Sequence, residues 1–168
     1  MDVVLLCNAN AYHPSHAILA LEANKYVLCE KPLALNYRDI DAIIAAESKS
    51  QGRVFVGYQR RYAAAFLDAV EEVGGMQKVQ YARVRDIIGP NSTFVAQSGT
   101  FPQKFTDFRK EDTEEMMQRD EEMMGQAFKE YGVKVTPEAV DMGRLLARYF
   151  PSPFFFSNSS LMFASGTA

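Results

Sequence analysis

Several motifs that identify common catalytic and nucleotide-binding proteins are missing from this sequence of 168 residues. There is no Gly-x-Gly-x-x-Gly segment, the loop through which a backbone usually approaches a dinucleotide pyrophosphate. A Walker loop, a Gly-x-Ser-x-Gly elbow and a Cys-x-x-Cys pair are also absent. The sequence therefore offers no phosphate-binding loop and no candidate for nucleophilic catalysis.

The composition excludes further classes of partner. A net charge of −3 without a basic run gives no basis for binding nucleic acid or a membrane surface. No apolar stretch reaches the roughly 20 residues that span a bilayer, and no basic region precedes the first apolar run as in a secretory signal. We expect a cytoplasmic protein. Its two cysteines, Cys7 and Cys29, lie in apolar runs and are predicted to be reduced core residues without a disulfide.

The first 58 residues alternate between two kinds of pattern. Short apolar runs at residues 3–7, 26–30 and 54–58 are typical of strands buried on both faces. Between them, residues 13–25 and 36–53 have helical spacing of apolar residues. Pro14 suits a first turn, Asn24 and Gly52 are predicted ends, and Asn36 is a predicted cap. This order predicts an α/β fold with parallel strands.

A different pattern follows. A helix over 62–75 should stop at the glycines 74–75, and alternation in 76–87 predicts a strand with one solvated face, so a second architecture should begin there. Residues 89–110 resemble a long loop. Two more helices are expected at 112–131, whose methionines should form a core face, and at 136–150. Residues 151–168 carry three adjacent phenylalanines and no charge.

Polar residues follow each of the three expected strands: CNANAYH, CEKP and GYQRR. Ligands of parallel α/β sheets bind beyond the carboxyl ends of the strands, so these segments predict a small-molecule site. Lys31 could donate to a substrate oxygen or shuttle a proton, while Pro32 favours an extended Lys31. The residues alone leave a second interpretation open and favour it: Glu30, Lys31 and Pro32 simply end a strand at the surface.

His13 and His16 form a His-x-x-His pair, but zinc would need further ligands nearby and none is evident, so no metal site is expected. His13 is either a ligand contact or a residue of the helix start. Asn8 and Asn10 either belong to the site or only shape the turn.

The segment DVVLLCNANAYHPSHAILALEANKYVLCEKPLAL resembles the Gfo/Idh/MocA family of NAD(P)-dependent oxidoreductases, which act largely on sugars and cyclitols. Residues 8–13 match a Thr-Pro-Asn-x-x-His-like turn of that family, and residues 20–34 match its Glu-Lys-Pro segment. The resemblance implies the C-terminal half of a Rossmann-type parallel sheet in residues 1–75. The start of an α+β substrate domain would follow in 76–150, and a divergent tail in 151–168.

The same resemblance implies a site. Lys31 would be the catalytic lysine, polarising the substrate hydroxyl or carbonyl beside the nicotinamide, with a cis peptide bond to Pro32. The cofactor would be NAD or NADP, the substrate a sugar, polyol or cyclitol, and the full-length parent a homo-oligomer. The residues assigned to the cofactor are Asn8, Asn10, His13, Glu30, Lys31, Pro32, Gln59 and Arg61.

The sequence departs from the family at both ends. The glycine-rich loop is absent, and PSPFFFSNSS stands where an Asp/His pair is expected after TPEAVDMGRLLARYF. We therefore expect a chain truncated at both ends, an apolar sheet face left uncovered and impaired dinucleotide binding. Three functions remain open: an oxidoreductase fragment, a non-catalytic dinucleotide-binding regulator or sensor, and an unstable product without function.

Overall fold

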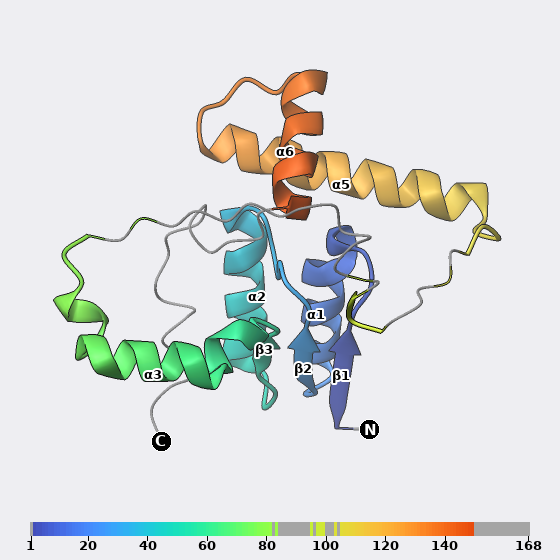
Figure 1. Ribbon diagram of the computed structural model, residues 1–168. Coiled ribbons are helices and arrows are strands. Elements are labelled where there is room, and N and C mark those ends of the chain that lie inside the picture. The colour runs from blue at the N-terminus through green and yellow to red at the C-terminus, as the bar shows by residue number, and fades with distance from the viewer. Residues whose placement is uncertain are drawn as a thin grey trace.

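The computed structural model describes residues 2–81, 83, 95, 97–99, 103 and 105–149. Within these residues, helices and strands alternate first and helices alone follow (Figure 1). The strands are β1 (Val3–Leu6), β2 (Tyr26–Cys29) and β3 (Val54–Val56). The helices are α1 (His13–Glu22), α2 (Tyr37–Lys49), α3 (Ala64–Val73), α5 (Lys110–Glu130) and α6 (Pro137–Tyr149), with short 3-10 turns at Asn10–Tyr12, Gln59–Tyr62 and Met76–Lys78.

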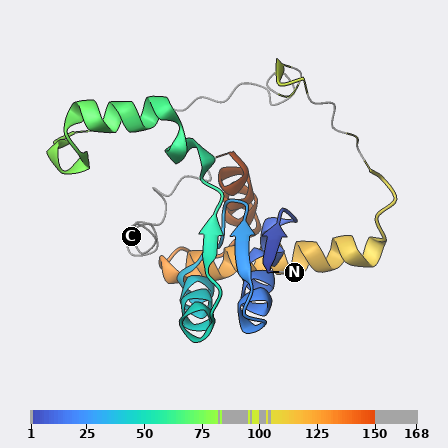
Figure 2. The same cartoon turned by 90° about the horizontal axis from the view of Figure 1, so that it is seen from below.

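The three strands form a parallel sheet in the order β1-β2-β3. Leu6 pairs with Cys29, and Cys29 pairs with Val56, so the three strands end level with one another. Helices α1 and α2 both lie against one face of the sheet, as Figure 2 shows from below. The predicted α/β fold with parallel strands is confirmed.

Local signals explain where most of these elements begin and end. Pro14 lies in the first turn of α1, and Asn24 adopts a positive φ of 55° just beyond its end. The Asn36 side chain accepts a hydrogen bond from the backbone N–H of Asp39 at 2.8 Å and so caps α2. Gly74 follows α3 in the left-handed conformation, with φ of 80°.

The predicted end of α2 at Gly52 is wrong. The helix ends at Lys49, and Gly52 serves a different purpose. A Cβ atom at this position would lie 2.0 Å from the carbonyl oxygen of Lys25. Glycine is needed here because the segments leading into β2 and β3 approach each other more closely than any side chain allows.

The first core lies between the sheet and its two helices, and its members include Leu6, Leu21, Val27, Cys29 and Ile43. Cys29 is buried as predicted, and burial, reinforced by the charge of Glu30, raises the pKa of its thiol to about 12. Cys7 was predicted to be buried too, but it is exposed because β1 ends one residue before it.

Helix α5 crosses above the carboxyl ends of the strands, where α6 packs against it (Figure 1). A second core forms there from Leu35, Met123, Met124 and Val140. The methionine stripe is thus a core face only in part, because Met117 is 52% exposed. No described helix is long and apolar enough to cross a bilayer.

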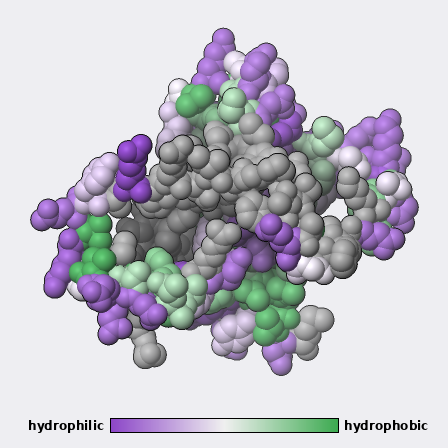
Figure 3. Space-filling model, viewed as in Figure 1, coloured by the Kyte–Doolittle hydropathy of each residue, from purple (hydrophilic) through white to green (hydrophobic). Residues whose placement is uncertain are grey.

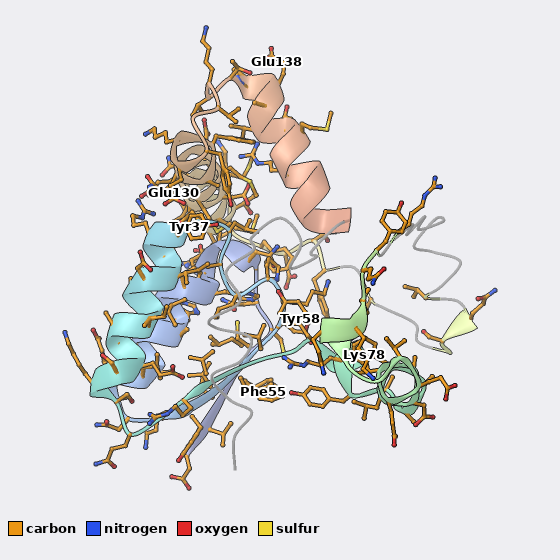
Figure 4. The ribbon with its side chains drawn as sticks, turned by 90° about the vertical axis from the view of Figure 1, so that its left-hand side faces the viewer. Tyr37, Phe55, Tyr58, Lys78, Glu130 and Glu138 are labelled. Atoms are coloured by element: carbon orange, nitrogen blue, oxygen red, sulfur yellow. The ribbon has the colours of Figure 1, made fainter. Side chains whose placement is uncertain are left out.

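Glu130 at the end of α5 fastens this helix to the start of α2 (Figure 4). Its carboxylate accepts hydrogen bonds from the backbone N–H groups of Tyr37 at 2.6 Å and Arg38 at 3.0 Å. Burial raises the pKa of Glu130, but the hydrogen bonds from the Gln126 side chain and these two backbone groups outweigh it and lower the pKa. Carboxylates near a helix N-terminus are favoured by the helix dipole.

From α3 onward, the structure agrees less well with the elements predicted from the sequence. Helix α3 extends away from the sheet, and none of its residues is buried (Figures 1 and 2). The strand predicted at 76–87 begins with a 3-10 turn at Met76–Lys78, and most of its remainder lies outside the described residues. The substrate domain at 76–150 therefore stays a prediction, and the predicted tail at 151–168 also lies outside the described residues.

Candidate active site

The segments that follow the three strands lie at one edge of the sheet. Backbone hydrogen bonds continue past the strand ends: the Glu30 N–H donates to Leu6 O, and the Gly57 N–H donates to Cys29 O, both at 2.8 Å. Asn8, Glu30 and Gln59 each follow a strand of this sheet closely. The predicted convergence of these segments at the carboxyl edge agrees with the parallel topology.

His13 connects two of these segments. Its ring is 1% exposed, with Nδ1 2.7 Å from the Pro32 carbonyl oxygen and Nε2 3.1 Å from the Asn8 carbonyl oxygen. A neutral imidazole can donate to one of these oxygens, and the imidazolium could donate to both. Both ring nitrogens of His13 therefore contact backbone carbonyl groups. The ring holds the segment after β1 against the segment after β2.

The segment from Glu30 to Asn36 is fixed at several points. The Lys31–Pro32 peptide bond is cis, as the family resemblance implied, and Pro32 is buried. Beyond it, Leu33 belongs to the first core and Leu35 to the second. Lys31 is partly exposed between the sheet and these buried residues. Its backbone is therefore held on the carboxyl side, while its side chain remains accessible.

The other predicted residues are less enclosed. Glu30 is exposed, and its carboxylate accepts a hydrogen bond from the Lys31 backbone N–H at 3.3 Å. The Asn8 amide lies 3.1 Å from Nδ1 of His16. Asn10 opens the 3-10 turn before α1. Arg61 is exposed and lies with its guanidinium 5.5 Å from the centre of the Tyr62 ring.

A concavity of about 460 Å³ opens beside the ends of β2 and β3. Its floor consists of Leu5, Leu28 and Phe55, which come from the sheet face opposite α1 and α2. Glu30, Gln59 and Tyr62 line it as well, and the rings of Phe55 and Tyr62 stack with centroids 5.8 Å apart. An apolar floor with a carboxylate and an amide nearby suits a flat ring that carries hydrogen-bonding groups.

The predicted site residues thus separate into two groups. Glu30 and Gln59 line the concavity, whereas Asn8, Asn10, His13 and Pro32 are not among its lining residues. Lys31 does not line it either, although it directly follows Glu30. Among the residues described, no three His, Cys, Asp or Glu side chains are grouped so as to hold a metal ion.

Comparison with known proteins identifies the fold. Residues 1–58 match the model of an oxidoreductase family described as an NAD-binding Rossmann fold. This segment belongs to the Gfo/Idh/MocA family. The family match confirms the Rossmann-type assignment made from the sequence, and the predicted cofactor class of NAD or NADP agrees with it.

Relatives of the Gfo/Idh/MocA segment include curated dehydrogenases. A myo-inositol 2-dehydrogenase from Thermotoga maritima is 34% identical over 103 residues, which cover 59% of this chain and 31% of the relative. An inositol 2-dehydrogenase from Salmonella typhimurium is 43% identical over 68 residues, or 40% of this chain and 20% of the relative. The chain thus spans less than a third of the length of these relatives. A solved myo-inositol 2-dehydrogenase from Lactobacillus plantarum is 27% identical, with a TM-score of 0.42 over 44% of this chain and 22% of the other.

Sequence reasoning missed two features around the site. The first is the stacked pair of Phe55 and Tyr62, which alternation in β3 and the aromatic residue after GYQRR could have suggested. The second is the contact of α5 with the turn before α1. Arg119 lies 5.0 Å from the Tyr12 ring centre, and Tyr12 stacks on His16 at 5.4 Å. No local pattern places residue 119 beside residue 12.

Proposed function

We propose that this chain contributes the nicotinamide end of an oxidoreductase site, in which a hydride moves between NAD(P) and a hydroxyl-bearing carbon of a sugar, polyol or cyclitol. The observation that carries the proposal is the fixed position of Lys31. It stands at the carboxyl edge of a Gfo/Idh/MocA segment, and its neighbour Glu30 lines a concavity with an apolar floor. The relatives named as inositol dehydrogenases support a cyclitol or a similar polyol as substrate.

The residues present fit one end of the cofactor. The floor of Leu5, Leu28 and Phe55 could hold a nicotinamide ring, with Gln59 in reach of its carboxamide. The sequence has no glycine-rich loop for the pyrophosphate. We therefore expect binding through the nicotinamide end, and binding weaker than that of a complete dinucleotide domain.

Bound NAD(P) would supply the hydride acceptor. In this proposal the Lys31 amine accepts the proton of the substrate hydroxyl during oxidation, and the ammonium returns it during reduction. The buried Pro32 and His13 position the backbone of Lys31 without touching the reacting atoms.

Saturation-transfer NMR with NAD⁺ and the full chain tests the binding part. We expect the nicotinamide protons to receive more saturation than the adenine protons. Phe55→Ser should weaken this transfer, whereas Leu19→Ser, an exposed site on the outer side of α1, should leave it unchanged. Saturation confined to adenine, or equal transfer in both variants, would refute the proposal.

NADH formation from NAD⁺ and myo-inositol tests the catalytic part. Lys31→Ala should abolish it, and Lys25→Ala should not, because Lys25 lies at the opposite end of β2. Binding of NAD⁺ without turnover in the unsubstituted chain would instead favour a dinucleotide-binding regulator. The cytoplasmic location and the homo-oligomer expected from the sequence remain predictions.

A further inference from the structure

His16 lies at the end of a row of stacked groups that joins α5 to α1. Arg119 of α5 lies with its guanidinium carbon 5.0 Å from the centre of the Tyr12 ring, and this ring stacks on His16 with centres 5.4 Å apart. Hydrophilic side chains surround the first turns of α5, at the right of Figure 3. Glu115, one turn before Arg119, accepts a hydrogen bond from its Nε at 2.8 Å. The ring of His16 is therefore restrained from the side of α5.

Asn8 is held on two sides by histidine rings. Its main-chain carbonyl oxygen lies 3.1 Å from Nε2 of His13, and its side-chain nitrogen Nδ2 lies 3.1 Å from Nδ1 of His16. An amide nitrogen can only donate, so Nδ1 of His16 acts as the acceptor and the proton of the neutral ring is on Nε2. Among the described residues, none donates a hydrogen bond to the amide oxygen Oδ1 of Asn8. This oxygen is the atom that Asn8 can offer to a ligand.

We propose that His16 is a positioning residue that aims Oδ1 of Asn8 at a hydroxyl of the ribose next to the nicotinamide. This role rests on the proposed function. Asn8 follows β1 and Gln59 follows β3, so the two amides stand on opposite sides of β2. Neighbouring strands are about 4.8 Å apart, which separates the two amides by roughly 10 Å along the sheet edge. With the carboxamide at Gln59, the ribose attached to the same ring is the group that can reach Asn8.

Positioning by His16 matters because the Asn8 side chain is otherwise free to rotate. Asn8 is exposed, and its amide has no described partner other than His16. Ordering a free side chain on binding costs about as much free energy as one hydrogen bond contributes net. An Asn8 amide already fixed by His16 can therefore gain affinity from a ribose hydroxyl, which donates directly to Oδ1. A freely rotating amide would gain little from the same hydroxyl.

The stack gives α5 an indirect part in the same site. Arg119 belongs to α5, outside residues 1–58 that match the family model. Neither Arg119 nor Tyr12 is among the residues that line the concavity. Both act through the ring of His16, since a cation over an aromatic face and a stacked aromatic pair each favour one ring orientation. Tyr12→Leu should therefore loosen the His16 ring while leaving its acceptor nitrogen in place.

Saturation-transfer NMR titrations of the full chain test the effect on binding, with NAD⁺ and with analogues that lack the 2′- or the 3′-hydroxyl of the nicotinamide ribose. One of the two analogues should bind the unsubstituted chain about fivefold more weakly than NAD⁺, the equivalent of one hydrogen bond. In His16→Phe, which keeps a ring against Tyr12 but lacks the nitrogen, this difference should fall below about twofold. His16→Gln, whose amide oxygen can accept, should restore part of it. Leu19→Ala, at an exposed site on α1, is the matched control and should keep the full difference.

NMR of the free chain separates this role from the proposed function. Long-range nitrogen–proton spectra should show His16 with its proton on Nε2, and the Asn8 side-chain amide signals should shift in His16→Phe. A proton on Nδ1 of the neutral ring, or unshifted amide signals, would overturn the role of His16 even where NAD⁺ binds.

An equal loss of affinity for the analogue in the unsubstituted chain and in His16→Phe would overturn it as well. Absence of binding by every ligand would instead refute the proposed function and the ribose contact with it, while the spectra of the free chain would still decide whether His16 holds Asn8. Far-UV circular dichroism must show that His16→Phe remains folded. If it does not, Tyr12→Leu takes its place and should narrow the difference between NAD⁺ and the analogue in the same direction.

Discussion

Replacement of His13 by alanine tests how the two segments of the carboxyl edge are held together. The His13 ring is buried and lies between the carbonyl oxygens of Asn8 and Pro32. Alanine removes both ring nitrogens and leaves the two carbonyl oxygens facing a cavity. We expect the free energy of unfolding to fall because neither carbonyl oxygen gains a new protein partner.

The magnitude follows from three contributions. A hydrogen bond contributes about 1 kcal/mol net, and a buried acceptor left without a partner costs about 1–3 kcal/mol. The cavity left by the ring adds a further loss that depends on how far the site collapses. For His13→Ala we expect a total of roughly 3 kcal/mol. His16→Ala, at a half-buried ring that contacts the Asn8 amide and stacks on Tyr12, should cost about 1 kcal/mol.

Urea unfolding of the full chain, followed by far-UV circular dichroism, measures both values. The denaturant slope should stay the same in the two variants, so that the midpoints report stability. His13→Gln should recover part of the loss because its amide can donate to one carbonyl. Equal losses at His13 and His16, or no recovery with glutamine, would refute the bridging role of the buried ring.

Three further predictions concern the frame around the site. Gly52→Ala should destabilise the chain by several kcal/mol or prevent folding, since its Cβ would lie 2.0 Å from a backbone oxygen. Gly125 lies within α5, and a Cβ atom there would be 3.9 Å from its nearest neighbour, Val135. Gly125→Ala should therefore stabilise the chain by about 0.5–1 kcal/mol, and thermal melts compare the two variants. Because hydrogen bonds outweigh burial and lower the pKa of Glu130, its stabilisation is present above its ordinary value of 4.5 and is lost as pH falls through the lowered value. Glu130→Gln should therefore flatten the acid side of a plot of melting temperature against pH, and an unchanged slope would contradict this. A thiol reagent should modify exposed Cys7 quickly and Cys29, whose pKa is raised to about 12, only on unfolding, and modification of both thiols at one rate would contradict this.

The parts of the fold that local sequence patterns determine were predictable. Asn36 caps α2 through its side chain, and Asn24 follows the end of α1 with a positive φ. Both preferences belong to asparagine itself, so the sequence near each residue is enough to predict these helix boundaries. The alternation of apolar runs and helical spacing predicted the parallel sheet, and the parallel sheet in turn predicted that the three polar segments meet.

The parts that depend on distant contacts were not predictable in this way. The environment of His13 is set by Pro32, nineteen positions away, so its sequence position near a strand end suggested a ligand contact just as well. Gly52 was read as a helix stop because its close approach to Lys25 has no local signature. Cys7 differs from Cys29 only in lying one residue beyond a strand.

The position of Lys31 links the two groups of helices in the structure. The segment that follows it sends Leu33 into the core under the sheet and Leu35 into the core of α5 and α6. Asn36 caps α2 and also donates to the Met123 carbonyl oxygen at 3.4 Å. The four residues that connect Pro32 to the start of α2 therefore link the sheet to α5, in addition to the contacts of α5 with the turn before α1 and with the start of α2. These buried neighbours hold the backbone of Lys31 in place, as the proposed function requires of a lysine beside the nicotinamide.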